Sequence, residues 1–357
     1  MNMRLVVENN QQVSEGSGRT SLYLLVATLV FLALMALAWM TPGAALAQNI
    51  TYYKPYYEGM LGGHLAVRDG HRNILNIITD NAREKEMGHL VLKLGLNASS
   101  IKTKTGSYVD SDNLNTALSL AWKNESIIGQ TTLGAFVEAG SGSYDTYNGI
   151  RGVSVYGDGQ TEYYGGGVFF HNLFSTNTYV EGSFRLGSLD NDYDVRDVAH
   201  AKFDTSQTYY GAHLGVGQKI AVTPCAELDV YLKGLWDRTE GKRIKTRAGQ
   251  HFSFSDADSF RTSLGGRLTQ GFDDDHVVKG YVGAAWEYEF DGKVKASYAN
   301  GVRNENKSVD LKGSTAFAEA GIIIDPENSP MSIDVGIFGL AGQQRGLGGT
   351  AGLKFEF

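Results

Sequence analysis

Polar and apolar residues alternate along most of the chain after residue 88, in segments of roughly ten residues. The first segment, HLVLKLGL (89–96), has leucine at every second position, and the last, TAGLKFEF (350–357), alternates apolar with charged residues. ELDVYLKGLWD (227–237), SFRTSLGGRL (259–268) and GYVGAAWEYEF (280–290) repeat the pattern between them. Because successive side chains of a strand point to opposite faces, this period predicts β-strands. About twelve such segments predict an all-β fold.

Charged residues recur on the polar side of these segments. Their positions help to decide whether the strands form a soluble sheet or a barrel in a membrane. A soluble antiparallel sheet also alternates, with one face toward a core and the other toward water. A membrane barrel turns its apolar face to lipid and accepts charges only toward a wet lumen. The charged residues expected to face such a lumen are Glu138, Glu181, Arg185, Asp229, Lys233, Arg261, Arg267, Glu287 and Glu319.

The links between the segments are alternately long and short. The long links are polar and cover residues 97–113, 143–160, 190–207, 240–259 and 295–308. The short links cover residues 124–129, 173–177, 221–225, 273–276 and 325–330. Outer-membrane barrels combine short periplasmic turns with longer extracellular loops, whereas a soluble sandwich has no reason for strict alternation. We therefore predict a twelve-stranded antiparallel outer-membrane β-barrel over residues 89–357.

Residues 48–88 precede the first predicted strand and are expected to form a linker and a helix. Apolar residues at roughly helical spacing predict the helix over about residues 64–84, although nearby glycines weaken its start. Its charged side chains include Arg68, Arg72, Asp80 and Arg83. A helix with these charges cannot face lipid, so we expect it in the barrel lumen, with a periplasmic position near the mouth as the alternative.

The N-terminal 47 residues have the pattern of a cleaved export signal. An apolar run over residues 22–40 is followed by Pro42-Gly43 and by an A-x-A pattern at Ala45 and Ala47. We predict a signal peptide over residues 1–47, with a membrane-spanning helix as the alternative that the length of the run allows.

The composition of the chain argues against several classes of function. The chain of 357 residues has 32 basic and 39 acidic residues, a formal net charge of −7, and no concentrated basic stretch. We therefore expect no nucleic-acid partner. Cys225 is the single cysteine, which excludes an intramolecular disulfide framework and a cysteine-based metal cluster. We expect no cofactor and no metal.

Two polar segments contain residue types that occur in catalytic or metal-binding sites. His251 with Asp256 and Asp258 has the residue types of a water-activating protease site at a barrel rim. DNDYDVRD (190–197) begins like a calcium loop but lacks the glycine and the bidentate glutamate that such loops need. Solvated polar loops account for both segments, so we predict that the protein is not an enzyme.

The order of these elements resembles the autotransporter β-domain, the translocator of type V secretion in Gram-negative bacteria. The resemblance covers about 300 of the 357 residues, and its motifs are EGMLGGHLAVRDGHRNILNIITD, AELDVYLKGLWDRTEG, SFRTSLGGRLTQGF, YVGAAWEYEFDGKVKA and LGGTAGLKFEF. It implies a barrel that the outer-membrane assembly machinery inserts, with Leu353, Phe355 and Phe357 as an assembly signal. It also implies contact with outer-membrane lipids and lipopolysaccharide, and export of a passenger segment. Both termini are expected in the periplasm, or the N-terminus in the pore.

The chain departs from the family in one respect, because only about ten residues separate the predicted cleavage site from Glu58. A passenger is thus almost absent from this sequence. The alternative function is a porin-like or surface-interaction barrel that acts through its pore or its long loops. The helix also lacks the Asn-Asn pair at which some relatives cleave themselves, so we predict no autoproteolysis.

Overall fold

The computed structural model describes residues 54–81, 89–127, 129–150, 153–195, 201–245, 251–272, 277–299, 304–326 and 329–357. The predicted signal peptide lies outside these residues. Within them, no helix has both the length and the hydropathy to cross a membrane. The elements are α2 (Lys54–Asn81), β1 (Leu90–Lys104), β2 (Tyr108–Ser126), β3 (Gly129–Ile150), β4 (Val153–Phe174), β5 (Thr178–Val195), β6 (Ala201–Thr223), β7 (Ala226–Thr239), β8 (Arg243–Lys245), β9 (His251–Phe254), β10 (Ala257–Gly271), β11 (Val278–Ala299), β12 (Asn304–Asp310), β13 (Gly313–Ile324), β14 (Met331–Gly342) and β15 (Gln344–Glu356).

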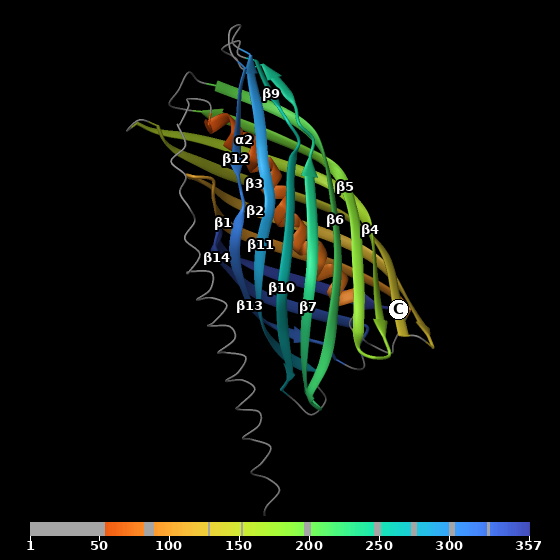
Figure 1. The fold of residues 1–357 in the computed structure, drawn as a ribbon. Helices are drawn as coiled ribbons and strands as arrows, with labels where there is room; N and C mark the ends of the chain where they lie inside the picture. The colour runs from red at the N-terminus through yellow and green to blue at the C-terminus, as the bar shows by residue number, and fades with distance from the viewer. Residues whose placement is uncertain are drawn as a thin grey trace, which may run out of the picture.

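Twelve of the fifteen described strands form a closed antiparallel barrel, and β8, β9 and β12 are short additions to it. Each barrel strand pairs with the next along the chain (Figure 1). β15 closes the ring on β1 in a continuous register from Val91↔Glu356 to Thr103↔Gln344. The predicted twelve-stranded barrel is confirmed. We call the end where β1 begins and β15 finishes the terminal end, and the opposite end the distal end.

Burial along the strands follows the predicted alternation. In β15, Lys354 and Glu356 are buried, Leu353 and Phe355 are partly exposed, and Phe357 after the strand is 63% exposed. Apolar side chains therefore point outward and charged ones inward, the reverse of a soluble protein. An apolar outer face around a closed sheet is the arrangement that a bilayer requires, because no backbone edge is left unpaired in lipid.

The long links were predicted as loops, and this prediction was wrong for most of their residues. β1 and β2 continue into the predicted loop 97–113 and are joined by residues 105–107 alone. β3 and β4 likewise pair from Gly129↔Phe174 to Ile150↔Val153, through the predicted loop 143–160. These extensions carry polar residues on their outer face, so they lack the apolar alternation by which a strand is found in sequence. The predicted short links do fall where one strand ends and the next begins at the terminal end.

The predicted helix is confirmed, but its start was placed too late: α2 begins at Lys54 rather than near residue 64. The prediction treated Gly59, Gly62 and Gly70 as unfavourable to a helix. In the structure each of these glycines lies against a tyrosine ring of the wall, where a Cβ would overlap Tyr193, Tyr144 or Tyr163. The glycines therefore let the helix approach the sheet, and packing outweighs intrinsic propensity.

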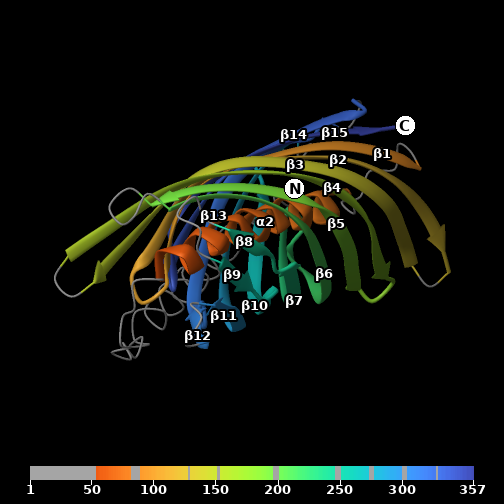
Figure 2. The ribbon, with the colours of Figure 1, turned by 90° about the horizontal axis from the view of Figure 1, so that it is seen from above.

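α2 lies inside the barrel and runs from the distal to the terminal end (Figures 1 and 2). Figure 2 shows strands β1–β5 arching over α2, and it packs mainly against them. Its first residues, including Tyr56, Tyr57 and Leu61, join an apolar core at the distal end. Its last turns, including Ile74 and Ile78, pack on the inner face near the terminal end.

Candidate functional site: the helix-filled lumen

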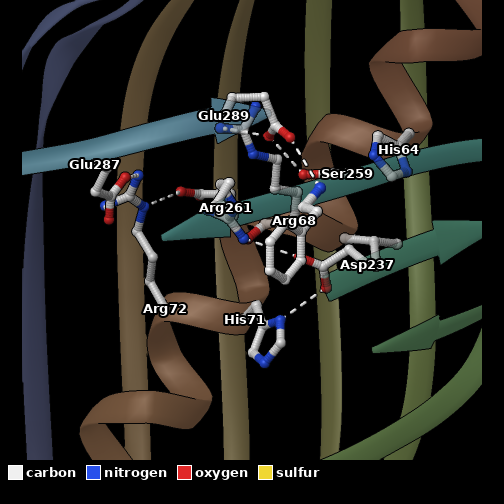
Figure 3. Close-up of polar contacts among 12 residues, drawn as sticks. His64, Arg68, His71, Arg72, Asp237, Ser259, Arg261, Glu287 and Glu289 are labelled. Carbon is white, nitrogen blue, oxygen red and sulfur yellow. Dashed lines mark hydrogen bonds and ion pairs between the residues drawn. The ribbon is translucent and has the colours of Figure 1, made fainter. Parts of the chain in front are cut away.

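The polar face of α2 meets charged side chains from the barrel wall at mid-depth. Figure 3 shows His64, Arg68, His71 and Arg72 of the helix directed toward residues of β7, β10 and β11. All four helix side chains are buried. A buried ionic group is costly unless it is paired, so the wall must supply matching charges.

Asp237 of β7 is the acceptor at the centre of this site. One carboxylate oxygen lies 2.7 Å from Nδ1 of His71, and the other accepts a hydrogen bond of 2.8 Å from Nη2 of Arg261 on β10. Nη1 of Arg185 lies 3.9 Å from Oδ1. Asp237 is fully buried, and one carboxylate therefore joins the helix to two wall arginines.

The two glutamates of β11 hold the two helix arginines. Arg72 donates to both oxygens of Glu287, at 3.2 and 2.8 Å, the forked geometry that suits a guanidinium. Nη2 of Arg68 lies 3.4 Å from Oε2 of Glu289, which also accepts a 2.6 Å hydrogen bond from Ser259. The helix is thus fixed on this side by charge pairs.

Two wall arginines also bond to the helix backbone or brace the wall beside it. Nη1 of Arg185 donates to the carbonyl of Val67 at 3.1 Å, while its Nε donates to Glu138 at 2.9 Å. Arg267 donates to both oxygens of Glu319 at 2.7 and 2.8 Å, wholly within the wall. The lumen therefore contains ion pairs of two kinds, wall to helix and wall to wall.

The residues singled out from sequence fall at different places in this arrangement. Arg68, Arg72, Arg261 and Glu287 lie in the helix–wall site, and Arg267 with Glu319 lies in the wall. Arg83 lies outside the described residues, as does the side chain of Asp80. His64, His71 and Glu289 were not among the residues predicted from the sequence, and Asp237 was predicted only as a polar position of its strand.

A cavity of about 80 Å³ lies beside α2, mainly between the helix and strands β7, β10, β11 and β13. It has room for several waters. Its lining includes Arg72, Asn76, Lys233, Arg267 and Glu319. The helix therefore fills most of the lumen and leaves a small space beside it that is large enough for water.

The segments considered for catalysis or calcium adopt other roles. Asp256 pairs with Arg238 and accepts a 2.8 Å hydrogen bond from the backbone N–H of Gly241, while His251 lies exposed on β9. Asp190, Asp192 and Asp194 lie on the outer face of β5 rather than around a loop. In the described part of the chain, no group of three or more His, Cys, Asp or Glu residues is arranged to hold a metal ion.

The profile of the family described as Autotransporter beta-domain matches residues 124–333. The fold is similar to the transport unit of the autotransporter AIDA-I from Escherichia coli, with a TM-score of 0.64, 14% identity, and coverage of 85% of this chain and 99% of that one. It is also similar to the translocator domain of the autotransporter NalP from Neisseria meningitidis, with a TM-score of 0.61, 13% identity, and coverage of 86% of this chain and 100% of that one. The beta domain of the Bordetella autotransporter BrkA is similar with a TM-score of 0.60, 15% identity, and coverage of 75% of this chain and 100% of that one. Among curated proteins, none matches the chain by sequence.

Proposed function

Since the chain belongs to the autotransporter β-domain family, it is a translocator barrel of the Gram-negative outer membrane, and we propose that α2 closes its pore once a passenger has been exported. The observation that carries the proposal is the buried set of ion pairs between α2 and the wall, centred on Asp237. A helix held by charges at mid-depth blocks the passage of solutes. The same charges would face water in an emptied lumen, so the helix can leave or enter without stranding them in lipid.

We place the distal end outside the cell and the terminal end in the periplasm. The short turns and Phe357 are then periplasmic, as in other outer-membrane barrels. Lys54 at the start of α2 is then at the cell surface, where a preceding passenger emerges. In this proposal the C-terminal side chains Leu353, Phe355 and Phe357 are read by the barrel-assembly machinery, and lipopolysaccharide surrounds the outer half of the wall.

The proposed role is transport rather than catalysis. The carboxylate of Asp256, the acid considered with His251, is already committed to Arg238 and to the backbone N–H of Gly241. A general base has to be within hydrogen-bond reach of the proton that it takes, and this carboxylate is held by donors of its own chain. Peptide cleavage is therefore not part of the proposed function.

Single-channel recording in planar bilayers tests pore closure. The intact protein should show low conductance, and a variant that lacks residues 54–81 should show a much larger, steady conductance. Each protein is first checked for the folded, heat-modifiable band. Asp291→Asn, an exposed change on β11, serves as the control and should remain closed.

High conductance in the intact protein would contradict the proposal and favour the porin-like alternative. The cavity beside α2 is the observation on which that alternative rests, because it leaves room for water next to the helix. Its narrowness favours closure, since a hydrated ion needs a continuous path through the lumen.

A further inference from the structure

The distal part of the wall continues well beyond the apolar outer band. On β2 and β3 the outward-facing large apolar residues stop at Leu114 and Val137. Both strands nevertheless stay paired as far as Tyr108↔Tyr147. At a rise of about 3.3 Å per residue, β3 therefore projects roughly 30 Å along its own direction past the last lipid-facing residue. This outer face is a sheet surface in water.

The side chains of this face lie in rows across neighbouring strands. One row runs directly opposite from β1 to β6 through Lys102, Asp110, Asp145, Asp158, Asp194 and Lys202. It thus places four aspartates between two lysines. Like charges directly opposite one another destabilise a sheet, so folding alone does not explain this row.

A second row, nearer the tip, is aromatic. Tyr108, Tyr147 and Tyr156 are direct partners across β2, β3 and β4. Their ring centroids are 5.2 and 5.3 Å apart. A continuous band of tyrosine faces therefore borders the row of carboxylates.

Lys102, a residue of this face, is held by the same two kinds of group that the rows provide, a carboxylate and a tyrosine ring. Nζ of Lys102 lies 2.8 Å from Oδ2 of Asp110 and 4.3 Å from the ring centroid of Tyr108. A carboxylate and an aromatic face together hold an ammonium group by charge and by cation–π attraction. Asp145 and Tyr147 repeat the same combination on the next strand. Among the described residues, no lysine or arginine forms an ion pair with Asp145.

A shallow groove of about 890 Å³ lies beside these rows on the same outer face. Its polar part includes Asp112, Ser143, Gln160 and Glu162, and its membrane side includes Leu114 and Leu347. Asp192 and Asp204 continue the row of Asp112 onto β5 and β6. A concave surface with carboxylates spread over several strands has the extent of a polypeptide segment rather than of a single ion.

We propose that this outer face binds a lysine-rich polypeptide segment at the cell surface. Lysine ammonium groups pair with the aspartate row, their aliphatic stems lie on the tyrosines, and the backbone follows the groove. A divalent cation is a poorer occupant for two reasons. The group already bound on this face is the ammonium of Lys102 over the ring of Tyr108, and in the described residues no three His, Cys, Asp or Glu side chains are grouped to hold a metal ion. The proposal is independent of pore closure, and only the location of the partner rests on the proposed orientation.

Binding of fluorescein-labelled decalysine to the full-length protein in detergent micelles, followed by anisotropy, tests the proposal. The double variant Asp145→Asn/Asp192→Asn should raise Kd about fivefold, as expected for two exposed carboxylates. The matched control Asp291→Asn/Asp310→Asn removes the same charge from exposed positions of β11 and β12 and should change Kd less than about twofold. Tyr147→Ala should also weaken binding, whereas Tyr147→Phe should keep it.

Folding of every variant is verified by the heat-modifiable band, so loss of binding cannot be loss of structure. Equal Kd values for the two double variants would overturn the proposal, because the attraction would then be net charge alone. Complete displacement of the peptide by Mg²⁺ at constant ionic strength would also overturn it, in favour of a cation site. A fall in affinity with rising salt together with the variant pattern above would support it.

Discussion

In α2, the absence of a Cβ atom at glycine positions determines how closely the helix packs against the barrel wall. A Cβ added at Gly62 would lie only 2.4 Å from the nearest ring carbon of Tyr144. That ring is held in place, because its hydroxyl lies 2.7 Å from the carbonyl of Gly59 and 2.9 Å from Oδ1 of Asn191. From the sequence, the effect of these glycines on the helix could be judged only by helix propensity, because the tyrosines that they contact belong to strands far along the chain.

We expect Gly62→Ala to destabilise the folded barrel although alanine is the better helix former. The propensity gain is about 1 kcal/mol, and overpacking a well-filled core costs about 1–3 kcal/mol. Urea unfolding in detergent, followed by tryptophan fluorescence, measures the difference. Combining the change with Tyr144→Val should recover part of the loss, whereas strictly additive effects would contradict the overlap.

Asp237 is the second residue whose role came from the structure. His71 and Arg261 meet it from positions 166 and 24 residues away in sequence, so no local pattern could bring the three together. Asp237→Ala leaves Arg261 buried without its closest acceptor and should cost about 3–5 kcal/mol in the same unfolding measurement. Asp291→Ala, which removes an exposed aspartate, should stay within about 0.5 kcal/mol. Similar losses for both would contradict a specific role.

At the scale of elements, the short strands β8 and β9 form a strap over the start of α2. β9 pairs with β11, and the ring of Phe252 stacks on Tyr56 with centroids 4.4 Å apart. The sequence predicted a polar loop here, because the segment has few alternating positions. Its apolar residues, such as Ile244 and Phe254, instead face inward and complete the distal core.

Asp256 connects this strap to β7, and it makes the strap sensitive to acid. The backbone N–H of Gly241, together with Arg238, holds the pKa of Asp256 below its usual range. A carboxyl with a lowered folded pKa stabilises the structure above its unfolded pKa and loses that contribution as pH falls through the folded one. Protection of the strap from hydrogen exchange should therefore decrease as pH falls below about 4.

The control for this pH dependence is Asp256→Asn, which removes the titrating group. This variant should already exchange faster in the strap at neutral pH, and its protection should no longer change across the acidic range. Unchanged protection in the variant would show that the aromatic contacts of Phe252 hold the strap without help from the carboxylate.

For the whole molecule, the alternation of polar and apolar residues was enough to predict a barrel of twelve strands, and the helical spacing and the charges of residues 64–84 predicted the helix in its lumen. Every strand that crosses the lipid turns apolar side chains outward, and this produces an alternation with a period of two in the sequence. The distal wall obeys no such rule, because water lies outside it, and its strands were therefore read as loops. Pairings across the lumen were equally hidden, since the even spacing of strands does not reveal which charges face each other.

Barrel closure brings the last residue beside the first strand, and this sets up a test of the C-terminal signal. The backbone N–H of Phe357 donates to the carbonyl of Leu90 at 2.8 Å, and the reverse bond is 3.2 Å. Phe357→Ala keeps both bonds and removes only the exposed ring.

If the ring is an assembly signal, the folded, heat-modifiable fraction of the Phe357→Ala variant in the outer membrane should fall in cells. Refolding of the purified variant into detergent should match the parent, because the ladder is intact. Phe357→Tyr, which keeps an aromatic ring, should assemble normally. A defect that appears equally in both settings would instead assign the ring to barrel stability.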